Sequence, residues 1–250
     1  MRSLTEGYAG GQDGDIYRTT DGGASWQSLG FTGNPVRGLS CPPSGAACYS
    51  VGDHGSTTII TGTVLTANNT GLASNLYSVH FPITSDEGWL CGGPIIRHFT
   101  GGAWQADQTY PTKYYAAIGF ADSLHGWAIG DGGEIIRTIT GGISDGNPWT
   151  GWQSSPNPAQ GATLSGVTVI SANEAWAVGN SGTVLHTTNS GQTWALETSG
   201  MTTSLLTAVH AEDSHTVYVV GNNGTLLKYS DATVILDHWI YLPIVVKSRP

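Results

Sequence analysis

The chain has 250 residues, of which 11% are charged and 36 are glycine; this length fits one large all-β domain or two small ones. The content of Trp, Tyr, Val and Ile argues against a disordered chain. With 18 acidic against 9 basic residues, the net charge of −9 argues against nucleic acid as a partner. No apolar run approaches the roughly 20 residues that span a bilayer. The start, MRSLTEGYAGG, lacks the apolar core of a signal peptide, so we expect a cytosolic protein or a chain without its true N-terminus.

One short pattern recurs along the whole chain. An aromatic residue, followed by small or apolar residues and then glycine, appears six times at intervals of about forty residues. The insertion ISDGNPWTGWQSSPNPAQG, residues 143–161, lengthens one interval. The aromatic residues are Tyr8, Tyr49, Trp89, Trp127, Trp176 and Tyr218.

Each full repeat contains four strand-like segments. In the fourth copy these are residues 114–120, 126–130, 134–138 and 149–154. Between the second and third segments, the sequences DGG, NSG and NNG begin at residues 131, 180 and 222 and tolerate positive φ, so we expect hairpin turns there. Four antiparallel strands in about forty residues are typical of a propeller blade. The sequence therefore predicts an all-β protein, a β-propeller of six blades, with a fragment of a seven-bladed propeller as the alternative.

The segment YRTTDGGASW, residues 17–26, returns as LHTTNSGQTW at residues 185–194. We interpret this motif as a structural turn between the third and fourth strands of a blade. The Asp21 carboxylate accepts hydrogen bonds from turn amides, Gly23 supplies an unusual backbone conformation, and Trp26 is expected to be buried between blades. The predicted structural residues are Thr19, Asp21, Gly23, Trp26, Thr187, Asn189, Gly191 and Trp194.

These repeats also resemble a known family. GWAIGDGGEIIRTITGG (126–142) and AWAVGNSGTVLHTTNSGQTW (175–194) are similar to repeats of the photosystem II stability and assembly factor family. The motif TTDGGASW places the chain in the wider group of Asp-box, or BNR-type, propellers. The resemblance covers residues 7 to about 229 and implies the propeller fold. It is less specific for function, because sialidases and xyloglucan-cleaving glycosidases share the box.

The cysteines bear on the compartment. Cys41 and Cys48 bracket a short loop and are candidates for a hairpin disulfide, which would imply an oxidising compartment. The surrounding SCPPSGAACYSVGD (40–53) resembles a cysteine-bracketed repeat of exported bacterial propellers. We therefore expect an extracellular, cell-surface or periplasmic bacterial protein. Cys91 is expected to be a small buried residue.

The two chain ends raise the question of ring closure. We assign residues 1–231 to the propeller repeats and 232–250 to a C-terminal tail. Within the tail, 233–236 is a candidate fourth strand of blade six, and 239–246 a candidate first strand of blade one. Such an exchange would close the ring without an exposed edge. Pro243 argues against a fully paired strand, and the alternative is a tail that forms a surface appendage.

A search for chemistry finds no catalytic set. The sequence has no nucleophile elbow, phosphate loop or zinc-ligand spacing, so we expect no metal and no cofactor. Five basic residues are assigned to one repeat position at the end of the third strand, which is either an ordinary structural slot or a cationic belt that docks an acidic partner. They are Arg18, Arg97, Arg137, His186 and Lys228.

Two functional hypotheses follow. The first is a non-catalytic scaffold that binds a protein partner, with Trp149 and Trp152 of the 143–161 insertion as candidate contacts. The alternative reading of these residues is that one is the displaced tryptophan of the blade. The second hypothesis is a carbohydrate-active propeller, either a sialidase-like or xyloglucanase-like glycoside hydrolase or a lectin. In that case the same tryptophans would stack on sugar rings.

Overall fold

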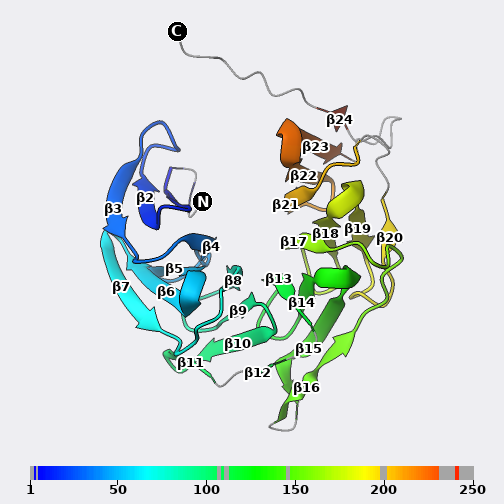
Figure 1. Cartoon of the computed structure of the whole chain (residues 1–250), viewed down its shortest axis with the longest axis horizontal. Coiled ribbons are helices and arrows are strands. Elements are labelled where there is room, and N and C mark those ends of the chain that lie inside the picture. The colour runs from blue at the N-terminus through cyan, green and yellow to red at the C-terminus, as the bar shows by residue number, and fades with distance from the viewer. Residues whose placement is uncertain are drawn as a thin grey trace.

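The computed structural model describes residues 3, 5–105, 108–109, 113–144, 147–197, 202–230 and 240–241. The chain is an all-β propeller of six antiparallel sheets, in agreement with the predicted fold class and blade number. Figure 1 shows the sheets arranged about a common axis in chain order. No helix within these residues is long and apolar enough to cross a membrane.

The strands of the first three blades follow the predicted order. Blade one contains β1 (Gly7–Gly10), β2 (Asp15–Thr19) and β3 (Gln27–Phe31). Blade two contains β4 (Val36–Ser40), β5 (Ala47–Gly52), β6 (Ser56–Thr61) and β7 (Val64–Asn69). Blade three contains β8 (Ser78–His80), β9 (Gly88–Gly92), β10 (Ile95–Thr100), β11 (Ala103–Trp104) and β12 (Gln108–Thr109).

The last three blades are four-stranded. Blade four contains β13 (Tyr115–Phe120), β14 (Gly126–Gly130), β15 (Ile135–Ser144) and β16 (Asn147–Ser154). Blade five contains β17 (Leu164–Val169), β18 (Ala175–Gly179), β19 (Val184–Thr187) and β20 (Ala195–Leu196). Blade six contains β21 (Leu206–Asp213), β22 (Thr216–Gly221), β23 (Thr225–Ser230) and β24 (Ile240–Tyr241).

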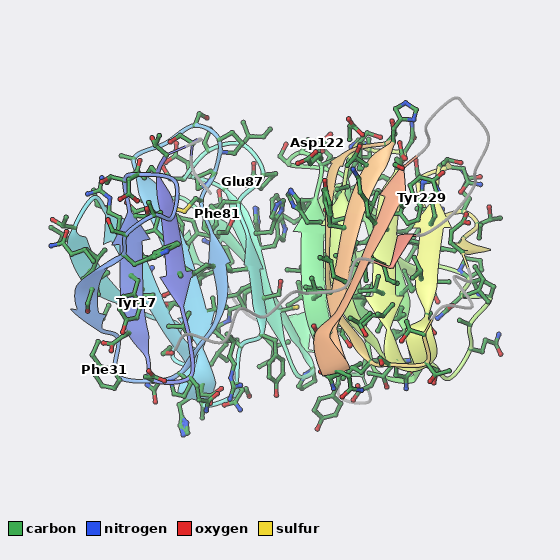
Figure 2. All side chains as sticks on the ribbon, turned by 90° about the horizontal axis from the view of Figure 1, so that it is seen from above. Tyr17, Phe31, Phe81, Glu87, Asp122 and Tyr229 are labelled. Atoms are coloured by element: carbon green, nitrogen blue, oxygen red, sulfur yellow. A yellow bond between two sulfur atoms is a disulfide. The ribbon has the colours of Figure 1, made fainter. Side chains whose placement is uncertain are left out.

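The predicted hairpin turns are confirmed. Each is a three-residue 3-10 turn whose middle residue has positive φ: 66° at Gly132, 55° at Ser181 and 58° at Asn223. A fourth such turn spans Asp53–Gly55. These turns lie on one face of the propeller, and the turns between first and second strands lie on the other. Figure 2 shows Phe31 at the first face, and Glu87 and Asp122 at the second.

The core is a series of interfaces between neighbouring blades. In blades two and three the second-strand aromatic residue stacks on a ring of the next blade. Trp89 lies 3.7 Å from Phe120 between ring centroids, and Tyr49 lies 3.8 Å from Phe81. Aliphatic side chains of the second and third strands fill the remaining space, and most of them are fully buried. Each interface therefore joins residues of adjacent repeats.

The segment that was predicted to supply the first strand of blade one pairs elsewhere in its described part. Figure 1 shows an arc of sheets that leaves blades one and six apart. Among the described residues β1 pairs with β2 alone, so blade one has three strands. From the segment 239–246, the described residues Ile240–Tyr241 pair with β23 of blade six rather than with β1. Residues 233–236 lie outside the described residues.

Candidate functional site

The two Asp-box turns are held by local hydrogen bonds. The Thr19 hydroxyl donates to the Asp21 carboxylate at 2.7 Å and accepts the Gly23 N–H at 2.9 Å. Asp21 also accepts the Ser25 N–H at 2.9 Å and the Ser25 hydroxyl at 2.5 Å. These bonds, that of the Ser25 hydroxyl first, lower the pKa of Asp21 from 3.8 to about 2. In blade five, Thr187 accepts the Gly191 N–H at 3.0 Å in the same way. All of these bonds lie within the turn itself.

The tryptophans that end the two boxes occupy different environments. Trp194 is 6% exposed, and its indole N–H donates to the Ser155 hydroxyl of the preceding blade at 3.0 Å. Trp26 is 44% exposed, so the prediction that it is buried between blades is wrong. In blade five the box tryptophan packs against the preceding blade. Trp26 belongs to blade one, and no blade precedes blade one among the described residues, so its ring stays exposed.

The five predicted basic residues do not form one belt. In four of the blades a basic residue lies opposite the second-strand aromatic residue: Arg18 opposite Tyr8, Arg137 opposite Trp127, His186 opposite Trp176 and Lys228 opposite Tyr218. In blade three that position is held by His98, not by Arg97, which corrects the predicted set. The turn at Gly93–Pro94 is one residue shorter than the 3-10 turns, and this moves the register.

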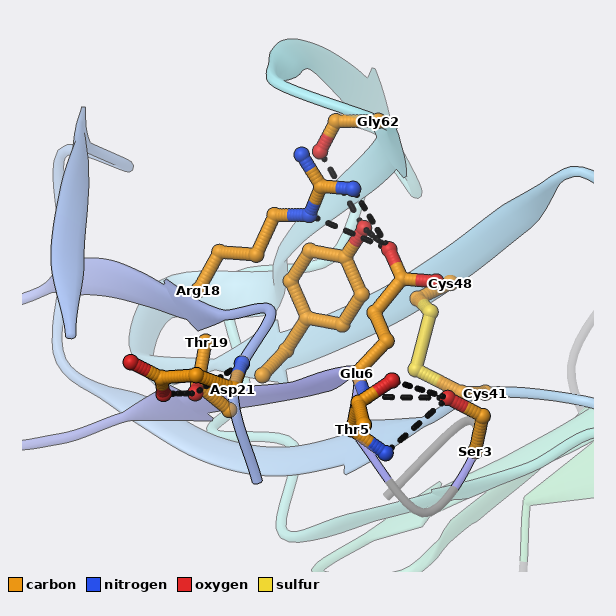
Figure 3. Close-up of polar contacts among 10 residues, drawn as sticks. Ser3, Thr5, Glu6, Arg18, Thr19, Asp21, Cys41, Cys48 and Gly62 are labelled. Carbon is orange, nitrogen blue, oxygen red and sulfur yellow. Dashed lines mark hydrogen bonds and ion pairs between the residues drawn. A yellow bond between two sulfur atoms is a disulfide. The ribbon is translucent and has the colours of Figure 1, made fainter. Parts of the chain in front are cut away.

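The basic groups have partners within the chain. Figure 3 shows the Arg18 guanidinium against the Glu6 carboxylate, with a closest distance of 2.8 Å. His98 and His186 each bond a glutamate, Glu87 and Glu174, at 3.0 and 3.1 Å. Burial lowers the pKa of His98, although Glu87 opposes this shift. These three basic groups therefore make their contacts within their own blades.

Arg137, Arg97 and Lys228 also have partners within the chain. Arg137 donates to the backbone carbonyl of Ser190 in the next blade at 2.7 Å. Arg97 donates to the carbonyl of Thr70 in the preceding blade. The Lys228 ammonium lies 5.5 Å from the centroid of the Tyr218 ring. The two arginines thus link neighbouring blades.

The tryptophans of the 143–161 insertion do not form an exposed pair in the described residues. Trp152 is 8% exposed and packs edge-on against Phe120, with ring centroids 5.8 Å apart. It is the tryptophan of blade four, as the alternative reading held, and the prediction of a surface contact at Trp152 is wrong. The side chain of Trp149 lies outside the described residues.

Carboxylates on the turns are also held structurally. Asp53 accepts two bonds from the Arg37 guanidinium, both at 2.9 Å, and these bonds hold the pKa of Asp53 below its usual range. Asp122 accepts the N–H groups of Leu124 and His125 at 2.7 and 2.8 Å. Within the described residues, no group of three or more His, Cys, Asp and Glu side chains could hold a metal ion. Turn geometry explains these acidic residues.

A tyrosine-lined pocket was not anticipated from the sequence. Tyr77 and Tyr114 immediately precede the first strands of blades three and four, and their side chains are 40% and 56% exposed. With Tyr115, Ala116 and Asp131 they line a pocket of about 220 Å³ on the face of the 3-10 turns. We call this site the tyrosine pocket. Exposed tyrosines beside one carboxylate suit a neutral or basic peptide side chain, because the ring faces and the carboxylate attract cations.

The cysteines form the bond that the loop sequence suggested. Cys41 and Cys48 are joined by a disulfide across the β4–β5 hairpin, at a sequence separation of 7. Cys91 is a free, buried thiol, and burial raises its pKa far above the usual range. The disulfide is therefore a local cross-link within the β4–β5 hairpin of blade two.

Comparison with known proteins gives one family match. The model of the family described as photosynthesis system II assembly factor YCF48 matches residues 98–230. A curated relative, the chloroplastic photosystem II stability/assembly factor HCF136 of Arabidopsis thaliana, is 32% identical over 130 residues. The match covers 50% of this chain but 32% of that protein, so the chain spans about a third of the relative's length.

Solved structures support the fold. A structure of YCF48 bound to a D1 peptide aligns with a TM-score of 0.53 at 16% identity, covering 93% of this chain and 92% of that one. The WD40 repeats of RRP9 align with a TM-score of 0.76 at 10% identity, covering 96% of this chain and 78% of that one. At these identities the likeness concerns the propeller architecture. The family match favours an assembly-factor repeat over a glycoside hydrolase.

Proposed function

The chain belongs to the family of photosynthesis system II assembly factor YCF48, and from this premise we propose that it is a non-catalytic propeller scaffold that binds a segment of a partner protein. One structure of a YCF48 holds a D1 peptide, which supports a peptide as the kind of ligand. The engagement of the turn carboxylates and basic groups within the chain supports the absence of catalysis.

The tyrosine pocket carries the proposal. It combines two exposed aromatic rings with a carboxylate in a concave site, and it lies where the first strands of blades three and four begin. Aromatic side chains at the centre of an interface supply much of its binding energy. Four of the five basic residues, which the sequence left open as a structural slot or a docking belt, are bonded within the chain. We therefore place the contact at the tyrosine pocket, with a neutral or basic peptide.

The test uses peptides tiled across D1, together with unrelated peptides of the same length and charge. Binding to the intact chain is measured by fluorescence anisotropy. We expect Tyr77→Ala and Tyr114→Ala each to weaken the best binder at least tenfold, which corresponds to about 1.4 kcal/mol. Phe31→Ala is the matched control, because it removes an exposed aromatic ring from another blade. Equal loss in the control would contradict the assignment of the pocket. A glycoside turnover that depends on Asp131 would overturn the scaffold function itself.

We also propose that the protein is exported to an oxidising compartment. The Cys41–Cys48 disulfide supports this, since such bonds persist mainly outside the reducing cytosol. Mass spectrometry of the protein alkylated directly in its native cells, without reductant, measures the state of both thiols. Labelled Cys41 and Cys48 would refute export.

A further inference from the structure

The chain contains one Asn-Gly pair, Asn223-Gly224, in the turn that joins β22 to β23. In such a pair the glycine nitrogen is able to attack the side-chain carbonyl of the asparagine, because glycine has no Cβ to hinder the approach. Asn223 has φ 58° and ψ 30°, and the Thr225 N–H closes the turn by donating to the Asn222 carbonyl. These are the features of a type I′ turn.

One local rotation brings this turn to the geometry of the reaction. A type I′ turn becomes a type II′ turn when its central peptide flips, and ψ of the first central residue is then about −120°. The flip swings the Gly224 nitrogen alongside the Asn223 side chain. Gly224 tolerates both the positive φ of the first turn and the negative φ of the second. The resting and the reactive turns therefore differ in one peptide unit.

The equivalent turn of blade five is covered by the chain that leads into blade six. Its residues 180–183, NSGT, differ from residues 222–225, NNGT, only at Ser181. The Gly182 N–H donates to the Ser204 carbonyl at 2.9 Å, and a Cβ on Gly182 would lie 2.1 Å from the Thr202 carbonyl oxygen. A flip of this peptide would break the bond to Ser204. Blade five thus holds the same turn in its resting form.

The turn of blade six is open. Asn223 and Gly224 are both exposed, and a Cβ on Gly224 would meet no atom of the described residues within 4 Å. Within the part of the chain that the structure describes, no linker carbonyl accepts the Gly224 N–H in the way that Ser204 accepts that of Gly182. In the other three 3-10 turns the last glycine is buried; these glycines are Gly55, Gly133 and Gly182.

We propose that Asn223 is a site of spontaneous deamidation. The Gly224 nitrogen forms a bond to the side-chain carbonyl carbon of Asn223, and the side-chain nitrogen leaves as ammonia with the proton of the Gly224 N–H. The product is a five-membered succinimide ring. Water then adds to one of the two ring carbonyls and breaks its bond to the Gly224 nitrogen. Opening at the side-chain carbonyl gives aspartate, and opening at the main-chain carbonyl gives isoaspartate.

The products change blade six. Both add a carboxylate to the face of the 3-10 turns, and isoaspartate also lengthens the main chain by one carbon atom. A longer chain does not fit the two-residue turn that the Thr225 N–H closes. The Asn222 N–H in this turn donates to the Leu205 carbonyl, just before β21, at 2.9 Å. Isoaspartate at Asn223 therefore weakens the attachment of the first strand of blade six. This proposal is independent of the tyrosine pocket, and either stands when the other fails.

The experiment incubates the intact protein at mildly alkaline pH and follows each asparagine by peptide mapping with mass spectrometry. An isoaspartate-specific methyltransferase measures the isoaspartate product. The peptide GNNGTLLK, the sequence of residues 221–228, gives the rate without a fold. We expect Asn223 in the folded protein to convert within about tenfold of the peptide rate, because the turn opens locally. Asn223→Ser, which copies Ser181 of blade five, should abolish the product.

Ser181→Asn is the matched variant, because it gives both turns the same four residues. We expect position 181 to convert at least about tenfold more slowly than Asn223, since the bond to Ser204 must break first. After incubation the wild type should unfold at a lower temperature than fresh protein, whereas Asn223→Ser should not change.

Three results would overturn the proposal. The first is an intact Asn223 in the folded protein when the peptide is fully converted. The second is equal conversion at positions 181 and 223, which would show that the cover over the turn has no effect. The third is an unchanged unfolding temperature of the deamidated wild type, which would contradict the weakening of blade six.

Discussion

His80 allows the coupling between two blades to be tested through pH. It ends β8 of blade three, and its Nδ1 accepts the Phe120 N–H of blade four at 3.0 Å. Burial lowers the pKa of His80 from 6.5 to about 4. The unfolded chain therefore binds a proton at His80 between these values while the folded chain does not. Stability is present above pH 6.5 and is lost as the pH falls towards 4.

The magnitude follows from the two pKa values. At about 1.4 kcal/mol for each tenfold change, His80 removes about 2 kcal/mol of stability at pH 5 and about 3 kcal/mol at pH 4, relative to pH 7. Urea unfolding at these three pH values measures the loss. We expect the pH dependence of His80→Gln to be weaker than that of the wild type by these amounts.

The repeat offers a matched control. His210 occupies the same strand position in blade six, after Val209 as His80 follows Val79, but its side chain is exposed. His210→Gln should keep the full pH dependence of the wild type. Parallel stability profiles for the wild type and His80→Gln between pH 7 and pH 4 would refute the reasoning, since they would show that the folded protein protonates His80 freely.

Further predictions concern the glycines, the disulfide and the box. Gly179→Ala should destabilise the protein by about 3 kcal/mol or more by chemical denaturation, because the added Cβ would collide with the Thr163 carbonyl. Gly11→Ala should change the stability by less than about 0.5 kcal/mol, because its Cβ would meet no atom of the described residues within 4 Å. Replacing Cys41 and Cys48 by serine should cost about 2–3 kcal/mol from the loss of the short loop closure, and an unchanged melting temperature would contradict this. Because the pKa of Asp21 is about 2 against 3.8, its stabilisation is present above pH 3.8 and fades as the pH falls through 2. The stability difference between wild type and Asp21→Asn, followed by circular dichroism in acid, should therefore shrink from pH 5 to pH 2.

The sequence predicted those parts of the fold that depend on local chemistry. The turn Asn180-Ser181-Gly182 reverses the chain because its residues tolerate positive φ. The aromatic residue recurs in the second strand, where a large ring can fill an interface between blades, as Trp89 does against Phe120. Assigning equivalent positions by counting residues from one repeat to the next is wrong where a turn differs in length. Gly93–Pro94 is one residue shorter than the other turns, so His98 rather than Arg97 faces Trp89.

Features that depend on neighbours in space were not visible in the sequence. Trp26 carries the same motif as Trp194, yet its exposure depends on whether a blade precedes its own. The tyrosine pocket joins Tyr77 and Tyr114, which belong to different repeats and share no local motif. The sequence leaves Trp152 open as a surface contact or as the buried tryptophan of its blade, because its burial depends on which sheet packs against it.

The packing of the box tryptophan Trp194 on the blade before it gives the molecule a direction. Trp194 reaches Ser155 of the preceding blade, so a blade finds its anchor in a part of the chain made earlier by the ribosome. Blades added in this way can be consolidated one after another during synthesis, because the stability of a repeat array is dominated by contacts between nearest neighbours. Shortening the gene from its 5′ end would then remove the anchor of the first remaining blade, whereas shortening it from the 3′ end would leave every remaining anchor in place.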